Sequence, residues 1–529
     1  MKIRRLHIHN YRSVKDSIID MQDYSLLVGS NNVGKSNVID AIRCFYEDIK
    51  FEPSDLCNKH EPEDRSCWID IIFDLSDDEY DSLKEEYKIE KNKLKVRKLL
   101  VQDGNRKPAI YGYTAKGIED NPFYGAKNVQ QGKFGKIVYV PAILDVKENT
   151  KLTGNSSLRN LLEIAFNGTL EKDVNYQEVA KSINKLTNSM KTEGSGALSK
   201  LETDINNELD DWGININFKL RTPSANDILK NMLDYNMQES EQEVPLERLG
   251  TGFQRHFIYN LIKLSSNYTE VKEKKDKDFT PNMTLLLFEE PEVFLHPTAQ
   301  ENLSLYLRKF ASHSANQVLI STHSSQFVSM NIMDIYSIIR LEKQDDITHV
   351  YQMKLSVDEL EKCKNLVFFD RPRSDLFFAT KVVLVEGATE YMFFNYIKQK
   401  NWIDTESTTK VCCIDTLGKQ SMPYFIKILK SFHIKYSVLW DLDTKPNVDP
   451  MTNPYNKAIF DSFDGLKEYH YCFEKNIEVF LTGEEWDHNG NKVVSFIKKV
   501  ENGEVVDEKK DELIQIFQDL ITKQEGLND

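Results

Sequence analysis

The segment GSNNVGKS, residues 29–36, constrains the fold of this chain more than any other feature. It fits the pattern GxxxxGK[ST], in which backbone N–H groups curl around phosphate oxygens and glycines leave no Cβ in the way. Such a loop requires a strand before it and a helix after it, and both are present. YSLLV precedes the loop, and KSNVIDAIRCFY follows it with one apolar stripe that comprises Val38, Ile39, Ile42, Phe45 and Tyr46.

The loop predicts binding of ATP together with Mg²⁺. Lys35 would reach the β- and γ-phosphates, Ser36 would bind Mg²⁺, and the N-terminus of the following helix would face the phosphates. The contacts to the nucleotide expected from this segment are Gly29, Asn32, Gly34, Lys35, Ser36 and Asn37.

The segment MTLLLFEEPE, residues 283–292, supplies the acids that such a site needs. A six-residue strand would bring Glu289 and Glu290 to its carboxyl end, where α/β sheets bind ligands. One carboxylate would hold Mg²⁺ and the other would polarise the attacking water; we assign these roles to Glu289 and Glu290 in that order.

Two weaker patterns fit the same site. LGTGFQR, residues 249–255, places Gly250 and Gly252 before a helix whose N-terminus could face the γ-phosphate. VLISTHSSQF, residues 318–327, ends a strand at His323, which could donate to that phosphate; a purely structural histidine is the alternative.

A second set of acids occurs late in the chain. YSVLWDLD ends an apolar strand with Asp441 and Asp443, and side chains on an extended strand repeat every second residue, so both are expected to point the same way. KVVLVEGATE ends another strand at Glu386 and places Glu390 near the start of the next helix. Four such carboxylates at one sheet edge suit Mg²⁺ or Mn²⁺, and two metals about 4 Å apart could clamp the attacking and leaving oxygens of a phosphodiester.

The length of 529 residues predicts two to four domains, and the composition, 40% hydrophobic and 29% charged, is that of an ordinary soluble protein. No run approaches the ~18 apolar residues of a membrane span and the N-terminus lacks a signal-peptide core, so we expect a cytoplasmic protein without membrane contact. The seven scattered cysteines show no CxxC spacing and are expected to fill the core. The net charge of −15 argues against a surface that is basic throughout but does not exclude a local basic groove.

The order of the nucleotide motifs resembles the ABC-type ATPase heads of SMC and RecF proteins. That resemblance makes Gly29–Ser36 the Walker A loop, Leu249–Arg255 the signature motif, Glu289 and Glu290 the Walker B pair, and His323 the switch histidine. Many relatives carry Asp at the position of Glu289, so the division of roles within the pair is open. The resemblance implies two heads that sandwich ATP, and hence a homo-oligomer.

The acids from 386 to 443, with the turn DTLGKQ at 415–420 between them, resemble the Toprim domain. An ABC-type head followed by a Toprim domain is similar to the OLD (overcoming lysogenization defect) family of nucleases. The resemblance implies two α/β domains: an ATPase at 1–370 with a helical dimerisation segment near 155–211, and a Toprim nuclease at 376–529, joined by a linker at 370–375. It also implies that a later acid and a lysine complete the site, for which the chain offers Glu478 and Lys492.

The sequence therefore predicts an ATP-regulated, metal-dependent DNA endonuclease or nickase, with a role in bacterial defence against phage and a possible accessory protein or nucleic-acid component. One rival is a DNA-binding ATPase of the recombination and repair type without nuclease activity. A second is an NTP sensor in which the nucleotide inhibits cleavage. An ABC transporter subunit fits the first half alone and is disfavoured by the acidic strands of the second.

Overall fold

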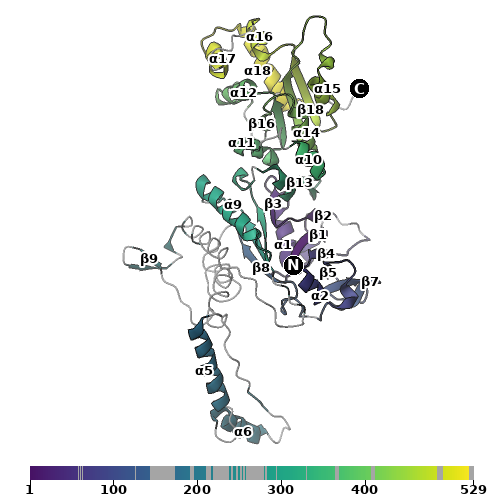
Figure 1. The fold of residues 1–529 in the computed structure, drawn as a ribbon, viewed down its shortest axis with the longest axis vertical. Coiled ribbons are helices and arrows are strands. Elements are labelled where there is room, and N and C mark those ends of the chain that lie inside the picture. Colours follow the sequence, from purple (N-terminus) through teal and green to yellow (C-terminus); the bar gives the residue numbers. More distant parts are fainter. Residues whose placement is uncertain are drawn as a thin grey trace.

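The computed structural model describes residues 1–142, 173–190, 196–209, short stretches between 216 and 257, and 279–523. Within these ranges it leaves out 329–330, 364–368, 407–410, 485–491 and a few single positions. The described chain forms an ATPase core in the middle, a four-stranded domain at the C-terminal end and a helical arm at the opposite end (Figure 1).

A six-stranded sheet forms the centre of the ATPase core. Its order is β14-β13-β3-β12-β11-β8, and all neighbours are parallel except the antiparallel pair β13–β14. The strands are β3 (Tyr24–Val28), β8 (Lys136–Val140), β11 (Thr284–Glu289), β12 (Asn316–Ser321), β13 (Ile338–Gln344) and β14 (Ile347–Tyr351). The expected α/β fold is confirmed, and the parallel pairs β3–β12 and β12–β11 place the phosphate loop and the end of the strand that carries Glu289 at the same edge of the sheet.

Helices cover both faces of this sheet, so every residue of β3 is buried. Leu26 and Val28 pack with α9 (Pro297–Ala311), whereas Leu27 packs with α1 (Lys35–Phe45). Alternate side chains of a strand point to opposite faces, so a strand buried on both faces has no polar side.

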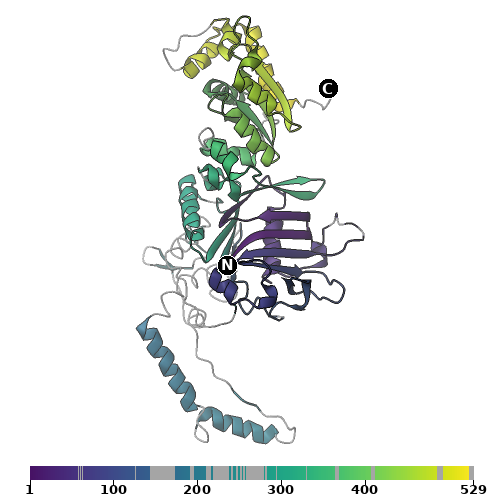
Figure 2. The same ribbon diagram turned by 45° about the vertical axis from the view of Figure 1, so that its right-hand side comes forward.

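An antiparallel sheet packs over the other side of α1, and Figure 2 shows its purple and blue strands beside the ATPase core. Its order is β2-β1-β4-β5-β6-β7. The strands are β1 (Lys2–Tyr11), β2 (Val14–Asp20), β4 (Trp68–Asp74), β5 (Lys93–Leu99), β6 (Ile110–Thr114) and β7 (Gly117–Pro122). The connections between its strands contain three short helices: η1 (Pro53–Asp55), α2 (Asp77–Asp81) and η2 (Glu85–Tyr87). The first strand, β1, is paired on both sides, with β2 and with β4.

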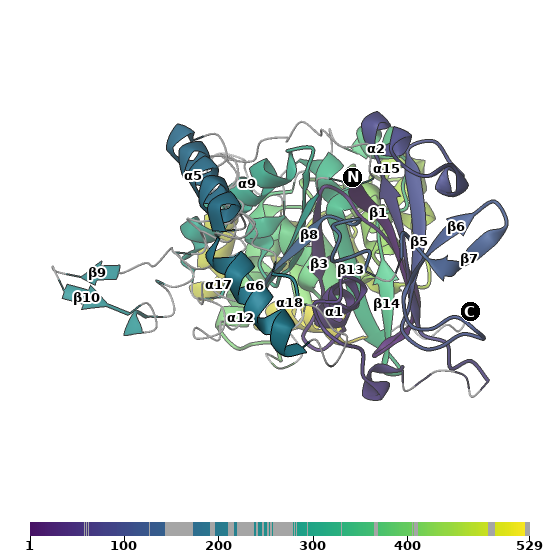
Figure 3. The same ribbon diagram turned by 90° about the horizontal axis from the view of Figure 1, so that it is seen from below.

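The helical arm lies on the side of the ATPase core away from the C-terminal domain (Figure 1). Two helices, α5 (Val174–Met190) and α6 (Ala197–Leu209), confirm the expected helical character of 155–211 over the residues described. A small hairpin of β9 (Met237–Glu239) and β10 (Gln242–Val244) projects on the side opposite β6 and β7 (Figure 3).

The C-terminal domain is built on a parallel sheet of order β16-β15-β17-β18. Its strands are β15 (Lys381–Val385), β16 (Val411–Asp415), β17 (Lys435–Asp441) and β18 (Lys467–Phe473). One face packs on α12 (Ala388–Gln399), α16 (Ile477–Thr482), α17 (Lys492–Glu501) and α18 (Asp507–Thr522). The other packs on α14 (Met422–Ser431) and α15 (Pro454–Asp461), with η8 (Pro450–Thr452) before it.

The two domains share one hydrophobic core, which includes Leu26 of the ATPase sheet and Trp440 of the C-terminal sheet. The joining elements are η5 (Ser325–Phe327), η6 (Ile332–Ser337), α10 (Val357–Cys363), α11 (Arg371–Ser374) and η7 (Asp375–Phe378). The segment predicted as a linker at 370–375 is instead helical, because Asp370 caps α11 and Arg373 is buried against Asp415. All seven cysteines are free and none is exposed, as expected for core residues. Among the described residues, no helix is both long and apolar enough to cross a bilayer.

Candidate nucleotide and metal sites

The phosphate loop has the backbone geometry that its glycines predict. Gly29 and Gly34 have φ angles of 141° and 103°, which L side chains rarely adopt. A Cβ on Gly29 would lie 2.3 Å from the Leu341 carbonyl oxygen, so strand β13 packs directly against the loop. Helix α1 begins at Lys35, immediately after Gly34, and Ser36 is exposed in its first turn. The loop therefore presents a helix N-terminus to an anion.

Lys35 lies inside the loop. Its Nζ donates to the carbonyl oxygens of Gly29 at 3.1 Å and Ser30 at 3.0 Å, and it lies 2.8 Å from Nε2 of His323. Burial lowers the pKa of Lys35 to about 8, although the nearby acids oppose that shift. A bound phosphate would favour the charged lysine, as the expected role requires.

The structure brings the Walker B pair and the switch histidine to this lysine. Nε2 of His323 lies 3.7 Å from Oε1 of Glu290, and Tyr139 donates its hydroxyl to Oε2 of Glu289 at 3.0 Å. Burial, then the neighbouring Lys35, lowers the pKa of His323, so the imidazole is neutral near pH 7. Strand β12 ends at Ser321, two residues earlier than expected, and His323 follows in the loop.

Glu292 is a functional candidate that the sequence reasoning missed. Its two oxygens accept hydrogen bonds from the His323 backbone N–H at 2.5 Å and from the Thr322 hydroxyl at 2.9 Å. Burial raises the pKa of this carboxyl group. The glutamate therefore fixes the position of His323 beside Lys35. Its only signal in the sequence is a third acid close after Glu289 and Glu290.

The remaining nucleotide contacts are less fully described. Asn37 donates to the Ser13 hydroxyl at 2.7 Å, which ties it to β1–β2 rather than to the loop. Asn32 is exposed with a φ of 64°. In the predicted signature motif, Gly250 is described, whereas Gly252 lies outside the described residues.

In the C-terminal domain, strand order brings distant acids together. Strands β15 and β17 are parallel neighbours, with Val385 opposite Leu439, so the residues after them meet at one edge. Oε2 of Glu386 accepts a hydrogen bond from the Asp441 backbone N–H at 3.0 Å. Oε2 of Glu390 accepts one from the Gly387 N–H at 3.2 Å, as part of the N-terminal cap of α12.

The acids at this edge form one electrostatic cluster. Burial and then the carboxylates of Glu390, Glu386, Asp443 and Glu478 raise the pKa of Asp441 to about 9. Burial, and the nearby Glu386 and Glu478, raise the pKa of Glu390 to about 7. Glu478, near the start of α16, is only 1% exposed. The structure therefore brings the predicted Glu478 to the other acids.

This cluster suits a divalent cation. Oδ1 of Asp441 is buried without a hydrogen-bond partner, which is costly for a carboxylate unless a cation or proton compensates. Hard oxygen ligands in this number favour Mg²⁺ or Mn²⁺. Among the residues described, no three acidic, histidine or cysteine side chains already form a complete metal-binding set. Glu386 and Glu390 each direct one oxygen to a backbone N–H.

The position of Asp443 differs from the expectation. Strand β17 ends at Asp441, and Asp443 has a left-handed φ of 52°, so strand alternation does not align the two carboxylates. The Asp443 side chain is 58% exposed and pairs with Lys419. Lys419 also donates to the Asp441 carbonyl oxygen at 2.6 Å and is itself buried.

Lys419 is the second functional candidate that the sequence reasoning missed. It stands in the turn DTLGKQ, between the two acid-bearing motifs. The same turn is anchored to the site, because the Gly418 N–H donates to the Glu386 carbonyl oxygen at 2.8 Å. Lys492 is the first residue of α17, and its side chain lies outside what the structure describes.

Comparisons with known proteins agree with these two sites. Residues 1–328 match the family described as AAA ATPase domain, and residues 377–443 match the Toprim domain of overcoming lysogenization defect-like proteins. The chain belongs to that ATPase family and carries an OLD-like Toprim domain, so it is an ATPase–Toprim enzyme and the resemblance to the OLD family is confirmed.

Individual relatives align with most of the chain. The chain is 25% identical to the Old nuclease of Escherichia phage P2, over 85% of this chain and 78% of that protein. It is 24% identical to the endonuclease GajA of Bacillus cereus (strain VD045), over 84% of this chain and 75% of that protein. Among solved structures, an SMC head bound to the C-winged helix domain of ScpA aligns with 68% of this chain and 100% of its own, at 14% identity and a TM-score of 0.39.

Proposed function

We propose that this chain is a divalent-metal-dependent DNA endonuclease whose Toprim site is controlled by ATP bound to the N-terminal ATPase domain. The observation that carries the proposal is the acid cluster at the edge of β15 and β17, where the Glu386 carboxylate meets the Asp441 backbone. The relatives named nuclease and endonuclease, aligned over most of this chain, support the same reaction class.

The residues of the cluster would hold the metal and control its charge. Glu386, Glu390, Asp441 and Asp443 are the proposed ligands, and Glu478 adds negative charge behind them. A bound Mg²⁺ or Mn²⁺ supplies Lewis-acid activation of water and neutralises charge on the scissile phosphate. Lys419 neutralises Asp443 beside the cluster, and Lys492 is proposed to stabilise the phosphate in the transition state.

ATP would act through the Walker loop and the acids beside it. Lys35 and Ser36 would bind the phosphates and Mg²⁺, Glu289 would help to hold that metal, and Glu290 would polarise water. The position of Nε2 of His323 between Lys35 and Glu290 supports a role at the γ-phosphate. The core shared by the two domains supports regulation of the nuclease rather than two independent activities.

The direct test is cleavage of supercoiled plasmid with Mg²⁺ or Mn²⁺, with and without ATP, by wild type and Asp441→Asn. The proposal expects cleavage by wild type only in the presence of metal and a dependence of its rate on ATP. The matched control is Asp461→Asn, which removes an exposed acid of the same domain at the end of α15. Absence of cleavage in every condition would favour the rival DNA-binding ATPase, whereas cleavage without metal would overturn the proposed metal site.

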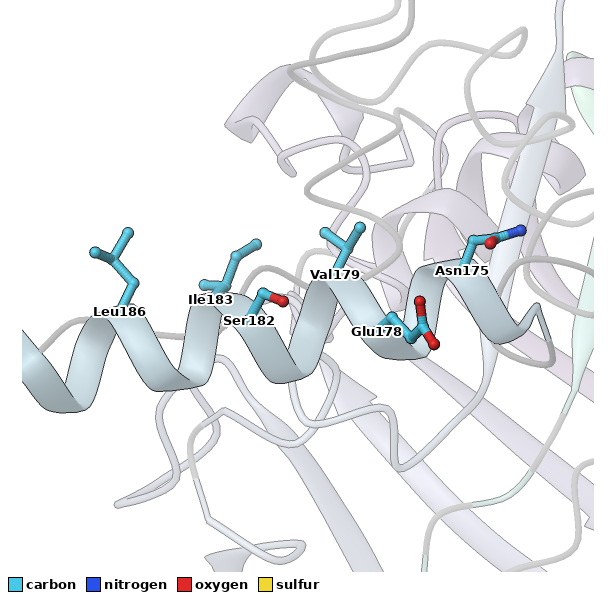
Figure 4. Close-up of a pocket in the computed structure, with 6 residues that line it drawn as sticks. All are labelled: Asn175, Glu178, Val179, Ser182, Ile183 and Leu186. Atoms are coloured by element: carbon cyan, nitrogen blue, oxygen red, sulfur yellow. The ribbon is translucent and has the colours of Figure 1, made fainter.

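The arm supports a further part of the proposal, a homo-oligomer formed through α5. An open hollow on this helix is lined by Asn175, Glu178, Val179, Ser182, Ile183 and Leu186 (Figure 4). Val179 and Leu186 are 49% and 59% exposed, an apolar stripe with helical spacing that a second copy of the arm could bury. Light scattering of wild type and Val179→Asp tests this, because a charge in the stripe would dissociate the oligomer.

We also propose a role in bacterial defence against phage, in the cytoplasm, together with an accessory defence protein or a nucleic-acid component. Family resemblance supports this role. Plating phage on cells that express wild type or Asp441→Asn tests it: protection should require the intact acid cluster. Equal plating on both strains would refute the defence role and leave the nuclease chemistry untouched.

A further inference from the structure

The β13–β14 hairpin contacts both the phosphate loop and the turn that precedes β17, the strand that ends at Asp441. On its nucleotide side, Arg340 pairs in register with Val28, the last residue before the phosphate loop. The Leu341 carbonyl oxygen lies 2.3 Å from the position that a Cβ of Gly29 would take, and the Thr348 hydroxyl donates to the Val33 carbonyl oxygen at 2.8 Å. A change in the backbone of the loop must therefore displace the hairpin or be resisted by it.

On its other side, the same hairpin holds the Toprim domain. The Arg340 guanidinium is buried and its Nη1 donates to the carbonyl oxygens of Phe432 at 3.0 Å and His433 at 3.3 Å. The His433 ring stacks on Tyr351 with centroids 4.7 Å apart, and Nδ1 of His433 lies 3.3 Å from Oε2 of Glu342. Three side chains of the hairpin, Arg340, Glu342 and Tyr351, thus contact the two-residue turn Phe432–His433.

That turn lies at the start of β17, and the acid cluster lies at the other end of the same strand. Phe432 and His433 join the end of α14 to β17, and β17 ends at Asp441. His433 has a left-handed φ of 53°, an uncommon backbone state for a residue other than glycine, which indicates that its surroundings fix it. Nearly the whole of β17 is buried, so the strand transmits a shift of its first residues to its last.

We propose that the β13–β14 hairpin transmits the nucleotide state of the phosphate loop to the Toprim site, with Arg340 and Tyr351 as positioning residues that act through the Phe432–His433 turn. The inference rests on the proposed control of cleavage by ATP and assigns that control to a structural route. Neither residue touches nucleotide, metal or DNA in this scheme. Their loss should alter the coupling between the sites rather than either site itself.

The experiment measures the ratio of plasmid cleavage rates with and without ATP at saturating Mn²⁺ for wild type, Arg340→Met and Tyr351→Leu. ATP affinity is measured separately to confirm that the loop is intact. We expect both variants to keep cleavage without ATP and to bring the ratio closer to one, by between about twofold and about thirtyfold. The matched control is Lys343→Gln on the same strand, which pairs with Asp346 at the hairpin turn and should keep the wild-type ratio.

The outcomes separate this inference from the proposed function. A wild-type ratio of one would overturn regulation by ATP and the hairpin route with it. If the wild-type ratio differs from one and Tyr351→Leu shows the same ratio, the hairpin route is overturned and regulation by ATP stands. Should Arg340→Met unfold below the assay temperature, Tyr351→Leu decides, because Tyr351 is only partly buried and leucine retains apolar contact.

Discussion

The Asp441 backbone N–H donates to the Glu386 carboxylate at 3.0 Å, although 55 residues separate the two in the sequence. This bond joins the carboxyl ends of β15 and β17 and places two acids of the Toprim cluster side by side. It also leaves Oδ1 of Asp441 buried without a partner. The cluster therefore carries an unfavourable concentration of negative charge that a cation would relieve.

The pH dependence of stability follows from that charge. The pKa values of Asp441 and Glu390 rise from ordinary values of 3.8 and 4.5 to about 9 and about 7 in the folded protein. The folded state thus holds these protons more tightly, so the stability they contribute is complete below about pH 4 and is lost as the pH rises through 7 and 9. We expect the melting temperature in EDTA to fall from pH 6 to pH 9, and less steeply in Asp441→Asn.

Mg²⁺ provides the control for that titration. Because the metal binds the deprotonated acids, its stabilising effect on wild type should grow with pH and should be small in Asp441→Asn. A melting temperature that is independent of pH in EDTA, or an Mg²⁺ effect that is equal in both proteins, would contradict the assignment of these raised pKa values.

Replacement of Lys419 should destabilise the metal-free protein. In Lys419→Met the acids lose the ammonium group that pairs with Asp443 and binds the Asp441 carbonyl oxygen. We expect the melting temperature in EDTA to fall by a few degrees and Mg²⁺ to restore most of the loss. Lys445→Met, an exposed lysine two residues beyond Asp443, is the control and should melt like wild type.

Replacement of Glu292 should slow ATP turnover more than it weakens ATP binding. In Glu292→Ala the His323 N–H and the Thr322 hydroxyl lose their acceptor, so the histidine is no longer fixed beside Lys35. We expect kcat for ATP hydrolysis to fall by about tenfold to a hundredfold, as for other supporting groups. Glu292→Gln keeps one acceptor oxygen, so its kcat should lie between those of wild type and Glu292→Ala. An unchanged kcat in Glu292→Ala would show that His323 needs no such support.

Replacement of Gly29 should cost stability through both strain and collision. Gly29→Ala imposes a φ of 141° on alanine and places its Cβ 2.3 Å from the Leu341 carbonyl oxygen. We expect the free energy of unfolding to fall by at least about 1–3 kcal/mol, measured by urea denaturation. Gly117→Ala has a φ of 111° with no atom within 4 Å, so it measures backbone strain alone and should cost less.

Much of the fold could be predicted from the sequence because its signals are local. Three features can be recognised from consecutive residues and form as predicted: the glycines of the phosphate loop, the apolar strand before it and the apolar stripe of α1. The same holds for Glu289 and Glu386, each at or just after the end of an apolar strand.

What could not be predicted depends on contacts between distant segments. The pairing of β15 with β17, which makes Glu386 and Asp441 neighbours, follows from strand order rather than from either motif. Lys419 and Glu292 act through partners that no spacing rule relates to them. The alternation rule for Asp443 failed because β17 ends at Asp441 and the chain turns. The boundaries at 370 and 376 stay predictions, with the matched families ending at 328 and starting at 377.

The most direct test of the Toprim assignment is Mn²⁺ binding to the nucleotide-free protein, followed by electron paramagnetic resonance alongside plasmid cleavage. Wild type should bind Mn²⁺ with an occupancy that parallels the cleavage rate, and Glu386→Gln combined with Asp441→Asn should lose both, with cleavage reduced at least on the order of a hundredfold. If the double variant binds as much Mn²⁺ as wild type or still cuts DNA at a similar rate, the metal site and its chemistry lie elsewhere in the chain.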